Sequence, residues 1–446
     1  MSKKDTKVFR DPIYNLISFD KNDEEPIINI ISTPEFQRLR RIRQLGFSNY
    51  TFPTAVHDRF SHSLGVAFII GELADNLGIG DQIEIPTIVE KGEIQNIKID
   101  KNELRLLLKL TGLLHDIGHG PFSHAFEKIT GVNHEEMTKK IIETQSISNI
   151  LSKIRYSETL SKYSKQWIID ILNGTFNPIW IKELISSQLD SDRIDYLLRD
   201  AYMCGVTYAS FDIKWLFKNI EVDTIKSEND REGLVINAKK GIHAVESFII
   251  SRYHMYEQVY FHKTTRCFEL IVQKIFERLL YLRKDNKISD SYFLNSSFLD
   301  ILEDKDNLNA FLELDDFTVF AHIKHWMNIS RDKILKKLCN YLLNRKPYKM
   351  IKEVELDYKD ISELEKDMRE KIPKDKFDYY FFVDDYKNVP YKDPYLIGEK
   401  VPEKAEHIWL KFENQQKELA EISPIIKSLK NKELKKYRAY VHRDYI

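Results

Sequence analysis

The sequence predicts a mainly α-helical fold with a smaller α+β lobe at its C-terminal end. Apolar residues recur at helical spacing through most of residues 1–345, whereas runs rich in aromatic and β-branched residues gather after residue 345. The chain has 446 residues, of which 42% are hydrophobic, enough for a sizeable core. We therefore expect a helical core over residues 1–345 packed against an α+β lobe over residues 346–446.

Several helices are predicted in order along the first part of the chain. Residues 34–46 carry Pro near the start and Gly at the end of an amphipathic pattern, and residues 61–78 open with Ser61 as a candidate N-cap. Residues 101–120 form a strongly apolar pattern, typical of a buried helix, that stops at its glycines. Further helices are expected near residues 134–144, 164–173, 178–187, 190–203 and 242–285.

Strands are predicted in two hairpins and in the C-terminal lobe. Residues 79–101 indicate a loop or a small hairpin, and residues 220–241 place a polar turn between two β-rich arms. In the lobe, the runs "YKMIKEVELD", "KFDYYFFVDD" and "HIWLKF" are predicted strands, with helices near residues 360–370 and 414–430. This mixture is the reason for the α+β assignment.

Charge and cysteine content exclude several classes of function. Lys and Arg number 68 against 69 Asp and Glu, so no global field indicates nucleic acid or a membrane surface. The three cysteines are too widely spaced for a disulfide framework or a metal-binding pair. The start "MSKKDTKVFRDPIYNL" does not resemble a secretory signal, and no apolar run approaches the roughly 20 residues of a membrane helix. We therefore expect a cytoplasmic protein.

The stretch "LLHDIGHGPFSHAFE" concentrates His115, Asp116, His119 and His124 at the end of a predicted apolar helix. Burying a carboxylate costs several kcal/mol unless it is paired or bound to a metal. Imidazole and carboxylate ligands together favour a transition metal ion with open positions for water and substrate. Other segments must supply the remaining ligands, and the candidates are His57, His62, Asp190, Asp192, Asp195 and Asp200.

Five motifs within residues 7–270 resemble, in order, the HD-domain superfamily and its branch of dNTP triphosphohydrolases. They are "RFSHSLG", "HDIGHGPFSH", "NHEE", "DSDRIDYLLRD" and "SRYHMYEQVYFHK". The resemblance implies an HD-type helical core within residues 1–345 and an enzyme that converts a dNTP to the deoxynucleoside and triphosphate.

The resemblance also implies four metal ligands, which are His62, His115, Asp116 and Asp192. Asp190 competes with Asp192 for the last place, and the register of "RIDYLLRD" with the family motif favours Asp192. The ion would be iron, manganese or zinc, among which the sequence does not choose. Magnesium would accompany the triphosphate.

Hydrolysis at the α-phosphorus requires a water of lowered pKa and a proton for the departing 5′ oxygen. His119, His124 and His134 are the candidate groups for this proton transfer. The resemblance assigns the donor role to His124. It makes Glu127, three residues later on the same helix, the acid that holds this histidine.

Substrate binding needs cations for the triphosphate and a close wall for the sugar. The resemblance places the phosphate-binding cations at Arg59, Arg193, Arg252, His262 and Lys263. It places Tyr260 under the sugar, where an aromatic wall would reject a 2′ hydroxyl, and it places Gln44, Tyr196 and Asp200 near the 3′ hydroxyl.

Family members often form tetramers with nucleotide activators between subunits, and this chain matches the pattern in part. Lys7, Gln37 and Arg40 match positions that contact the activator, whereas Ser32 and Arg10 depart from the pattern. A homotetramer is expected by analogy. A guanine preference of the activator site is not carried over.

Two rival functions stay open. Another HD phosphohydrolase would act on nucleotide monophosphates, cyclic nucleotides or single-stranded nucleic acid, which the set of candidate phosphate-binding cations disfavours. A sensor that binds nucleotides without turnover is disfavoured by the intact ligand set and the proton-transfer histidines.

Overall fold

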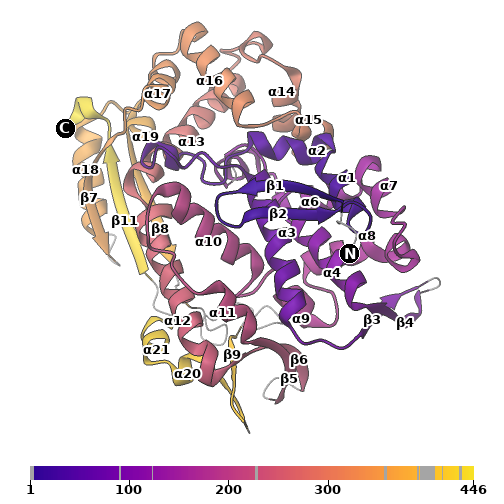
Figure 1. Ribbon diagram of the computed structural model, residues 1–446. Helices are drawn as coiled ribbons and strands as arrows, with labels where there is room; N and C mark the ends of the chain where they lie inside the picture. Colours follow the sequence, from indigo (N-terminus) through magenta and orange to yellow (C-terminus); the bar gives the residue numbers. More distant parts are fainter. Residues whose placement is uncertain are drawn as a thin grey trace.

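The computed structural model describes residues 5–89, 92–122, 124–226, 230–355, 359–388, 391, 407–413, 415–430 and 434–446. Helices dominate the described chain and small sheets lie around them, so the predicted fold class is confirmed (Figure 1). None of the described helices is long and apolar enough to cross a membrane.

The chain begins with the antiparallel hairpin β1 (Thr6–Asp11) and β2 (Asn15–Asp20), which precedes α1 (Glu25–Ile31). The helix expected over residues 34–46 is shorter than predicted. It consists of α2 (Pro34–Gln37) and the 3₁₀ turn η1 (Arg38–Arg41). The backbone then extends, because its hydrogen-bonding groups find tertiary partners. The N–H of Arg43 donates to Asp316, and the N–H of Gln44 donates to the His57 carbonyl.

The helices α3 (Arg59–Asn76), α4 (Lys101–Leu114) and α10 (Ser191–Cys204) form the centre of the molecule. The predicted cap Ser61 is wrong, because α3 starts two residues earlier with Asp58 accepting from the Ser61 N–H at 2.8 Å. Helix α4 ends at Leu114 instead of residue 120. His115 and Asp116 therefore stand just beyond its last turn, at the edge of the core.

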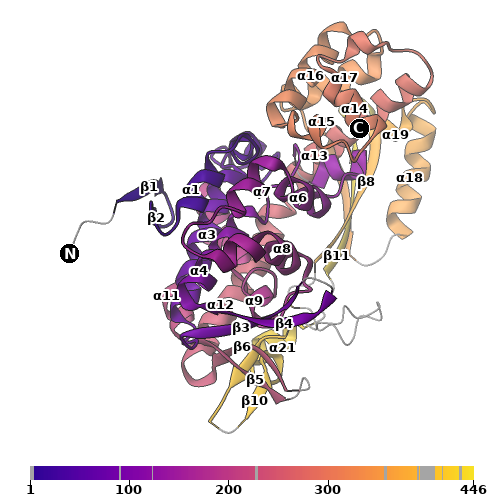
Figure 2. The same ribbon diagram turned by 90° about the vertical axis from the view of Figure 1, so that its right-hand side faces the viewer.

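Shorter helices surround this centre. They are α5 (His124–Thr130), α6 (His134–Ile142), α7 (Gln145–Leu151), α8 (Glu158–Asn173), α9 (Ile179–Glu183), α11 (Ile213–Lys218), α14 (Ser296–Glu303), α15 (Leu308–Leu312), α16 (Asp316–Ile329) and α17 (Lys333–Leu343). The helices α14 to α17 form one end of the molecule in both views (Figure 1 and Figure 2).

The continuous helical pattern expected over residues 242–285 is interrupted. It comprises α12 (Ala238–Met255), the π-helical turn η5 (Tyr256–Tyr260) and α13 (Lys263–Lys284). The side chain of His262 caps α13 by accepting from the N–H of Thr264 at 3.2 Å. Single π-helical turns are frequent at functional sites. This one turns Tyr256 and Tyr260 toward the interior cavity described below.

The hairpin predicted over residues 220–241 is present as β5 (Ile220–Ile225) with β6 (Arg231–Asn237). Of the two alternatives left open for residues 79–101, a loop or a small hairpin, the structure shows the hairpin, as β3 (Gln82–Ile88) with β4 (Ile94–Asp100). Two C-terminal strands extend the β5–β6 hairpin. Strand β9 (Trp409–Lys411) pairs parallel with β6, and β10 (Gln416–Glu418) pairs antiparallel with β9. Segments from both sides of residue 345 thus share one sheet, whereas the proposed domain boundary itself stays a prediction.

A second C-terminal sheet contains β7 (Lys349–Glu355), β11 (Leu434–Val441) and β8 (Phe381–Asn388), with β11 in the middle. It lies along the side of the molecule opposite the β1–β2 hairpin (Figure 2). The accompanying helices are α18 (Lys359–Lys371), α19 (Phe377–Tyr380), α20 (Leu419–Ile422) and α21 (Pro424–Leu429). One long helix over residues 414–430 was expected, which is wrong. Pro424 cannot continue a helix, so Ser423 is extended and caps α21.

Gly118 provides a test of how closely the loop after α4 packs on α6. Its N–H donates to Thr138 at 3.1 Å, and a Cβ at this position would overlap backbone atoms of His134 and Thr138. Because backbone cannot move aside cheaply, we expect Gly118→Ala to lower the free energy of unfolding by about 1–3 kcal/mol or more.

Urea unfolding midpoints followed by circular dichroism would measure this effect. Gly80→Ala is the matched control, because the nearest atom to its added Cβ is 3.9 Å away. Equal midpoints for the two variants would contradict the close packing.

Candidate metal centre and its cavity

Four side chains from three segments converge at one point. His62 comes from α3, His115 and Asp116 follow α4, and Asp192 lies in the first turn of α10. His62 Nε2 lies 3.0 Å from Asp192 Oδ1 and 3.6 Å from Asp116 Oδ2. His115 Nε2 lies 3.5 Å from Asp116 Oδ1 and 3.6 Å from Asp192 Oδ1. Donor atoms about 2 Å from one shared cation have this spacing.

The Nδ1 atoms of the two histidines form hydrogen bonds on the side of each ring that faces away from the cluster. His62 Nδ1 donates to Asp195 Oδ2 at 2.8 Å, and His115 Nδ1 donates to the Gly112 carbonyl at 2.8 Å. Such contacts select the tautomer and aim Nε2 at a metal. Within the described chain both Nε2 atoms are buried and have no hydrogen-bond partner. These two orphaned nitrogens are an observation that fits a metal ion.

The electrostatics of the cluster also call for a cation. Burial opposes a proton on His62, but the adjacent carboxylates of Asp192 and Asp195 outweigh it and raise the pKa of His62 to about 10. Burial would raise the pKa of Asp192, but His115 and His62 hold it well below the ordinary value. The carboxylates thus favour a positive charge at this point, either a proton on an imidazole or a bound cation. A set of two nitrogens and two oxygens fits iron, manganese or zinc without selecting one.

Asp190 and Asp192 have different surroundings. Asp190 caps α10, with Oδ1 accepting from the Arg193 N–H at 2.7 Å and Oδ2 from the Ser187 N–H at 2.8 Å. Burial raises the pKa of Asp190 to about 7. Its oxygens are therefore committed to the backbone, while Asp192 is the carboxylate that faces His62 and His115.

A second group of polar side chains adjoins the cluster. Arg59 Nη1 donates to Asp116 Oδ2, and His119 Nε2 lies 3.2 Å from Asp116 Oδ1. The ring of His119 stacks on that of His134 with centroids 4.1 Å apart and planes inclined by 13°. His134 Nδ1 donates to Glu127 Oε1 at 2.5 Å.

The two stacked imidazoles differ in their affinity for protons. Burial and the charge of Arg59 lower the pKa of His119 to about 3. Burial also opposes a proton on His134, but the hydrogen bond and charge of Glu127 outweigh it and raise the pKa of His134. His119 is therefore neutral near pH 7, whereas His134 holds a proton more readily than a free imidazole.

The carboxylate of Glu127 was expected to hold His124, but the contact that the structure describes is with His134. Helix α5 begins at His124, whose side chain lies outside the described part of the chain. Ligand atoms of His119, Glu127 and His134 all lie within 4.8 Å of one another. Stacked, nearly parallel rings cannot both direct a lone pair at one ion. The group is therefore better suited to proton transfer than to metal binding.

A cavity of about 500 Å³ opens beside the cluster. Asp116, Asp192, His119 and His134 are part of its wall. Five of the nine predicted substrate residues also line it, namely Gln44, Arg59, Tyr196, Asp200 and Tyr260. The structure thus joins the metal cluster and the predicted sugar-binding residues in one space.

The sugar-binding candidates form a connected group. Tyr260 donates its hydroxyl hydrogen to Asp200 Oδ2 at 2.8 Å, and His57 Nε2 lies 2.7 Å from Asp200 Oδ1. Tyr196 packs edge-on against Tyr260. The Oε1 atom of Gln44 is buried and has no hydrogen-bond partner among the described residues. It is thus an acceptor that a ligand hydroxyl can satisfy.

The other four predicted substrate residues are not in the described lining of this cavity. Arg252 is buried 5.6 Å from the ring of Tyr256, and its Nε has no partner among the described residues. Arg193 lies 3.3 Å from Asp190, and its charge and that of Arg252 act on Tyr196. His262 caps α13, and Lys263 is exposed.

The predicted activator residues lie elsewhere. Gln37 Nε2 donates to the Ile31 carbonyl at 2.6 Å, and Arg40 Nε donates to Gln37 Oε1 at 2.9 Å. Arg40 stacks 3.5 Å over the Phe60 ring and lines a separate hollow of about 200 Å³ beside β1. Lys7 is exposed on β1. Their role as activator ligands stays a prediction.

The sequence offered Asp195 and His57 only as candidate metal ligands, whereas the structure shows Asp195 holding His62 and His57 holding Asp200. Asp195 was detectable, because it lies three residues after Asp192 and therefore on the same side of α10. Three further residues that line the cavity were missed, namely Arg266, Glu269 and Gln273 on α13. Their spacing of three and four residues was the available signal.

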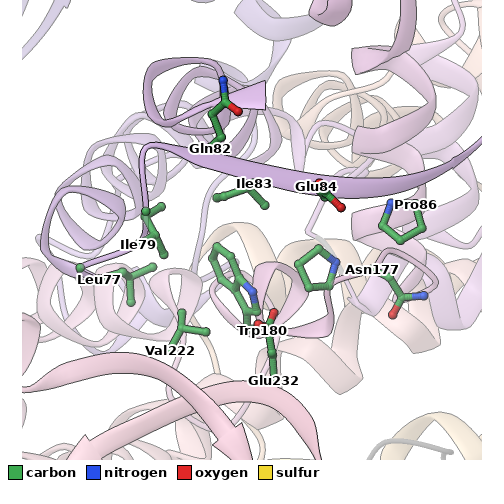
Figure 3. A pocket seen from close by; sticks show the side chains of 13 residues that line it. Leu77, Ile79, Gln82, Ile83, Glu84, Pro86, Asn177, Trp180, Val222 and Glu232 are labelled. Atoms are coloured by element: carbon green, nitrogen blue, oxygen red, sulfur yellow. The ribbon is translucent and has the colours of Figure 1, made fainter. Parts of the chain in front are cut away.

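A further cavity of about 570 Å³ lies between the β3 strand, α9 and the β5–β6 hairpin (Figure 3). Leu77, Ile79, Ile83 and Trp180 line it together with the carboxylates of Glu84 and Glu232. None of the described residues in its wall is a histidine, lysine or arginine. The described wall therefore lacks the cationic side chains that bind phosphates.

Comparison with known proteins agrees with this geometry. The chain matches the family model described as "HD domain" over residues 59–200 and that described as "HD associated region" over residues 222–444. It is 34% identical to the uncharacterized protein YwfO of Bacillus subtilis, over 99% of this chain and 93% of that protein. It is 26% identical to the deoxynucleoside triphosphate triphosphohydrolase SAMHD1 of Mus musculus, over 92% of this chain and 60% of that protein.

Two solved structures share the fold over nearly their whole length. A phosphohydrolase from Bacteroides thetaiotaomicron has a TM-score of 0.76 at 28% identity, and the match covers 98% of this chain and 100% of that chain. A hypothetical protein from Aquifex aeolicus has a TM-score of 0.72 at 29% identity, covering 99% and 97%.

The contrast between Asp192 and Asp190 can be measured as metal content. We expect Asp192→Asn to lower metal affinity by at least about 100-fold, because it removes a charged ligand that faces both histidines. Mutation of residues that only hydrogen-bond to metal ligands already lowers metal affinity by up to about 100-fold. Asp190→Asn retains a capping oxygen and should retain the metal.

Inductively coupled plasma mass spectrometry of the purified variants, dialysed against limiting manganese or iron, gives the answer. Equal metal content in the two variants would contradict the assignment of Asp192 to the cluster.

Proposed function

This chain belongs to the HD-domain family and carries its associated region, and from that premise we propose that it is a dNTP triphosphohydrolase. The coarser assignment, a metal-dependent HD-domain phosphohydrolase, follows from the family together with the His/Asp cluster. The finer one is supported above all by the shared cavity, in which a hydroxyl-binding group adjoins the cluster. Distant likeness to proteins named as dNTP triphosphohydrolases supports it further.

The metal would be held by His62, His115, Asp116 and Asp192, with one ring nitrogen from each histidine and oxygens from the two aspartates. A transition metal ion in such a site acts as a Lewis acid and makes water nucleophilic at neutral pH. Asp195 and the Gly112 carbonyl keep the two imidazoles turned toward the cluster.

Arg59 would bind the α-phosphate. It lines the cavity, and its guanidinium is anchored by Asp116, so it stands beside the cluster in a defined orientation. A guanidinium offers several N–H donors in one plane and suits phosphate oxygens. Arg193 and Arg252 lie near Tyr196, in the neighbouring part of the molecule, and would attract the β- and γ-phosphates. Magnesium would accompany these phosphates.

Among the described residues, His134 is best suited to protonate the departing 5′ oxygen. Its ring lines the cavity, and Glu127 favours its protonated form. His119, held neutral by burial and Arg59, would support the stacked ring instead of donating a proton. His124 is the donor that the resemblance designates, and it stays a candidate.

Gln44, Asp200 and Tyr260 would select the sugar. The unsatisfied Oε1 of Gln44 can accept a hydrogen bond from a 3′ hydroxyl, and Asp200 is held beside it by Tyr260 and His57. The phenol ring of Tyr260 would lie against C2′, where an added hydroxyl has neither room nor a partner. Deoxynucleotides would therefore be preferred.

Assembly and activation are proposed by analogy. Lys7, Gln37 and Arg40 match activator positions in family members, and Arg40 borders a hollow beside the β1–β2 hairpin. A homotetramer with nucleotides between its subunits is consistent with this position.

The direct test is product analysis with purified protein, manganese, magnesium and each dNTP, alone and with other nucleotides as activators. We expect deoxynucleoside and triphosphate as products, and a preference over ribonucleotides of roughly 100-fold. Inorganic phosphate or short oligonucleotides as products would support another HD phosphohydrolase. Nucleotide binding without any product would sink the proposal.

The pairing of His134 with Glu127 predicts a pH effect. Because the carboxylate raises the pKa of His134, it keeps the imidazole protonated to a higher pH. Glu127→Gln removes that charge, so the pKa should fall and the alkaline limb of the kcat profile should move to lower pH. His134→Ala and His124→Ala, assayed alongside, distinguish the two candidate donors.

Glu135→Gln is the control, since it changes an exposed carboxylate next to the same histidine. An unchanged alkaline limb in Glu127→Gln, with activity retained, would exclude His134 as the proton donor.

A further inference from the structure

The α13 wall of the cavity consists of Arg266, Glu269 and Gln273, which lie on one face of the helix. None of them contributes to the metal cluster, the proton-transfer group or the sugar contacts described above. Glu269 and Gln273 offer hydrogen-bonding groups inside a substrate-sized space. They are therefore placed to contact part of a bound substrate.

Arg266 is committed to its neighbours. Its Nε and Nη2 donate to Asp384 of β8 at 3.2 and 2.7 Å, and its Nη1 donates to Glu269 Oε2 at 2.5 Å. Asp384 is buried, so this contact fixes Arg266 from the C-terminal sheet. Arg266 thereby acts as a positioning residue that holds the carboxylate of Glu269 at the cavity wall.

The charges of the cavity surroundings distinguish the α13 wall from the wall formed by α10 and η5. Arg193 and Arg252 lie near Tyr196, on the α10 side, where a triphosphate would be stabilised. Arg266 also lines the α13 wall, but it is paired with the carboxylates of Glu269 and Asp384, so the group keeps a net negative charge that would repel phosphates there. Lys128 of α5 also lines the cavity but is exposed, so solvent screens its charge. The α13 wall therefore suits an uncharged part of the substrate.

We propose that Glu269 and Gln273 bind the nucleobase and select among the four bases, an inference that rests on the proposed dNTP triphosphohydrolase function. An ionised carboxylate only accepts hydrogen bonds, whereas an amide both donates and accepts. Glu269 therefore favours bases with an exocyclic amino group, which are adenine, cytosine and guanine. Thymine lacks this group, so dTTP is the poorest substrate.

Gln273 adds the complementary donor. Its amide makes no hydrogen bond to other described residues and lines the same wall, one helical turn beyond Glu269. It can donate to a ring nitrogen or carbonyl of the base whose amino group reaches Glu269. Gln273 is half-buried, and an amide that a bound base shields from water but leaves unpaired penalises that base.

The experiment compares kcat/KM for all four dNTPs in wild type, Glu269→Gln and Gln273→Leu. In wild type we expect dTTP to lie at least about tenfold below the best dNTP. Glu269→Gln should reduce this ratio by about tenfold, because an amide can also donate to a thymine carbonyl. Gln273→Leu should change the order of the amino-bearing bases.

Glu277→Gln is the matched control, the same chemical change at an exposed position two turns along α13. It should leave all ratios unaltered. Gln273→Leu keeps the test available if Glu269→Gln fails to fold, as judged by circular dichroism. Equal kcat/KM for the four dNTPs in wild type, or a uniform change for all four in both folded variants, would overturn the inference.

Failure of the proposed function is recognised separately. If wild-type protein releases no triphosphate from any dNTP, the same comparison is made with dissociation constants from isothermal titration calorimetry. Weaker binding of dTTP that depends on Glu269 would support the base-selecting wall. Equal dissociation constants for the four dNTPs would overturn it.

Discussion

The position of the metal cluster depends on a buried ionic contact between α3 and α10. Asp195 accepts from His62 on one side and from Arg199 on the other, at 2.8 Å each, and Arg199 reaches Asp11 at 2.7 Å. Such buried charges are tolerated only when every member is paired. Gly65 makes this contact possible, because a Cβ there would overlap the Asp195 carboxylate. The contact holds two helices at the distance at which Asp192 meets His62.

The cavity is built where regular structure stops. The segment after η1 leaves the helix and carries Gln44, α4 ends two residues before Asp116, and the π-helical turn between α12 and α13 carries Tyr260. At each interruption the backbone leaves regular helical geometry, so a polar side chain there can point into the cavity. The C-terminal sheet completes the arrangement, because Asp384 fixes Arg266 and Arg438 donates to the Phe261 carbonyl. The associated region therefore supports the α13 side of the cavity.

Two stacked imidazoles beside the cluster lie in unequal environments. Burial and the charge of Arg59 keep His119 neutral, while the same charge keeps Asp116 ionised. Glu127 acts in the opposite direction on His134. Burial and the charge of Arg59 thus favour the neutral form of His119, whereas Glu127 favours the protonated form of His134. This difference was not visible in the order of the residues along the chain.

The sequence by itself determined the class of the fold and the hairpin over residues 220–241, because periodicity and turn residues are local properties. It also contains the motifs whose resemblance to the HD-domain family identified His62, His115, Asp116 and Asp192. Only the tertiary structure decided where helices end. The helix expected over residues 34–46 stops early because the backbone N–H groups of Arg43 and Gln44 donate to Asp316 and to the His57 carbonyl. It also decided the partner of Glu127 and brought the α13 wall to the cavity. Contacts between residues far apart in the chain carry no periodic signal, so only the packed molecule reveals them.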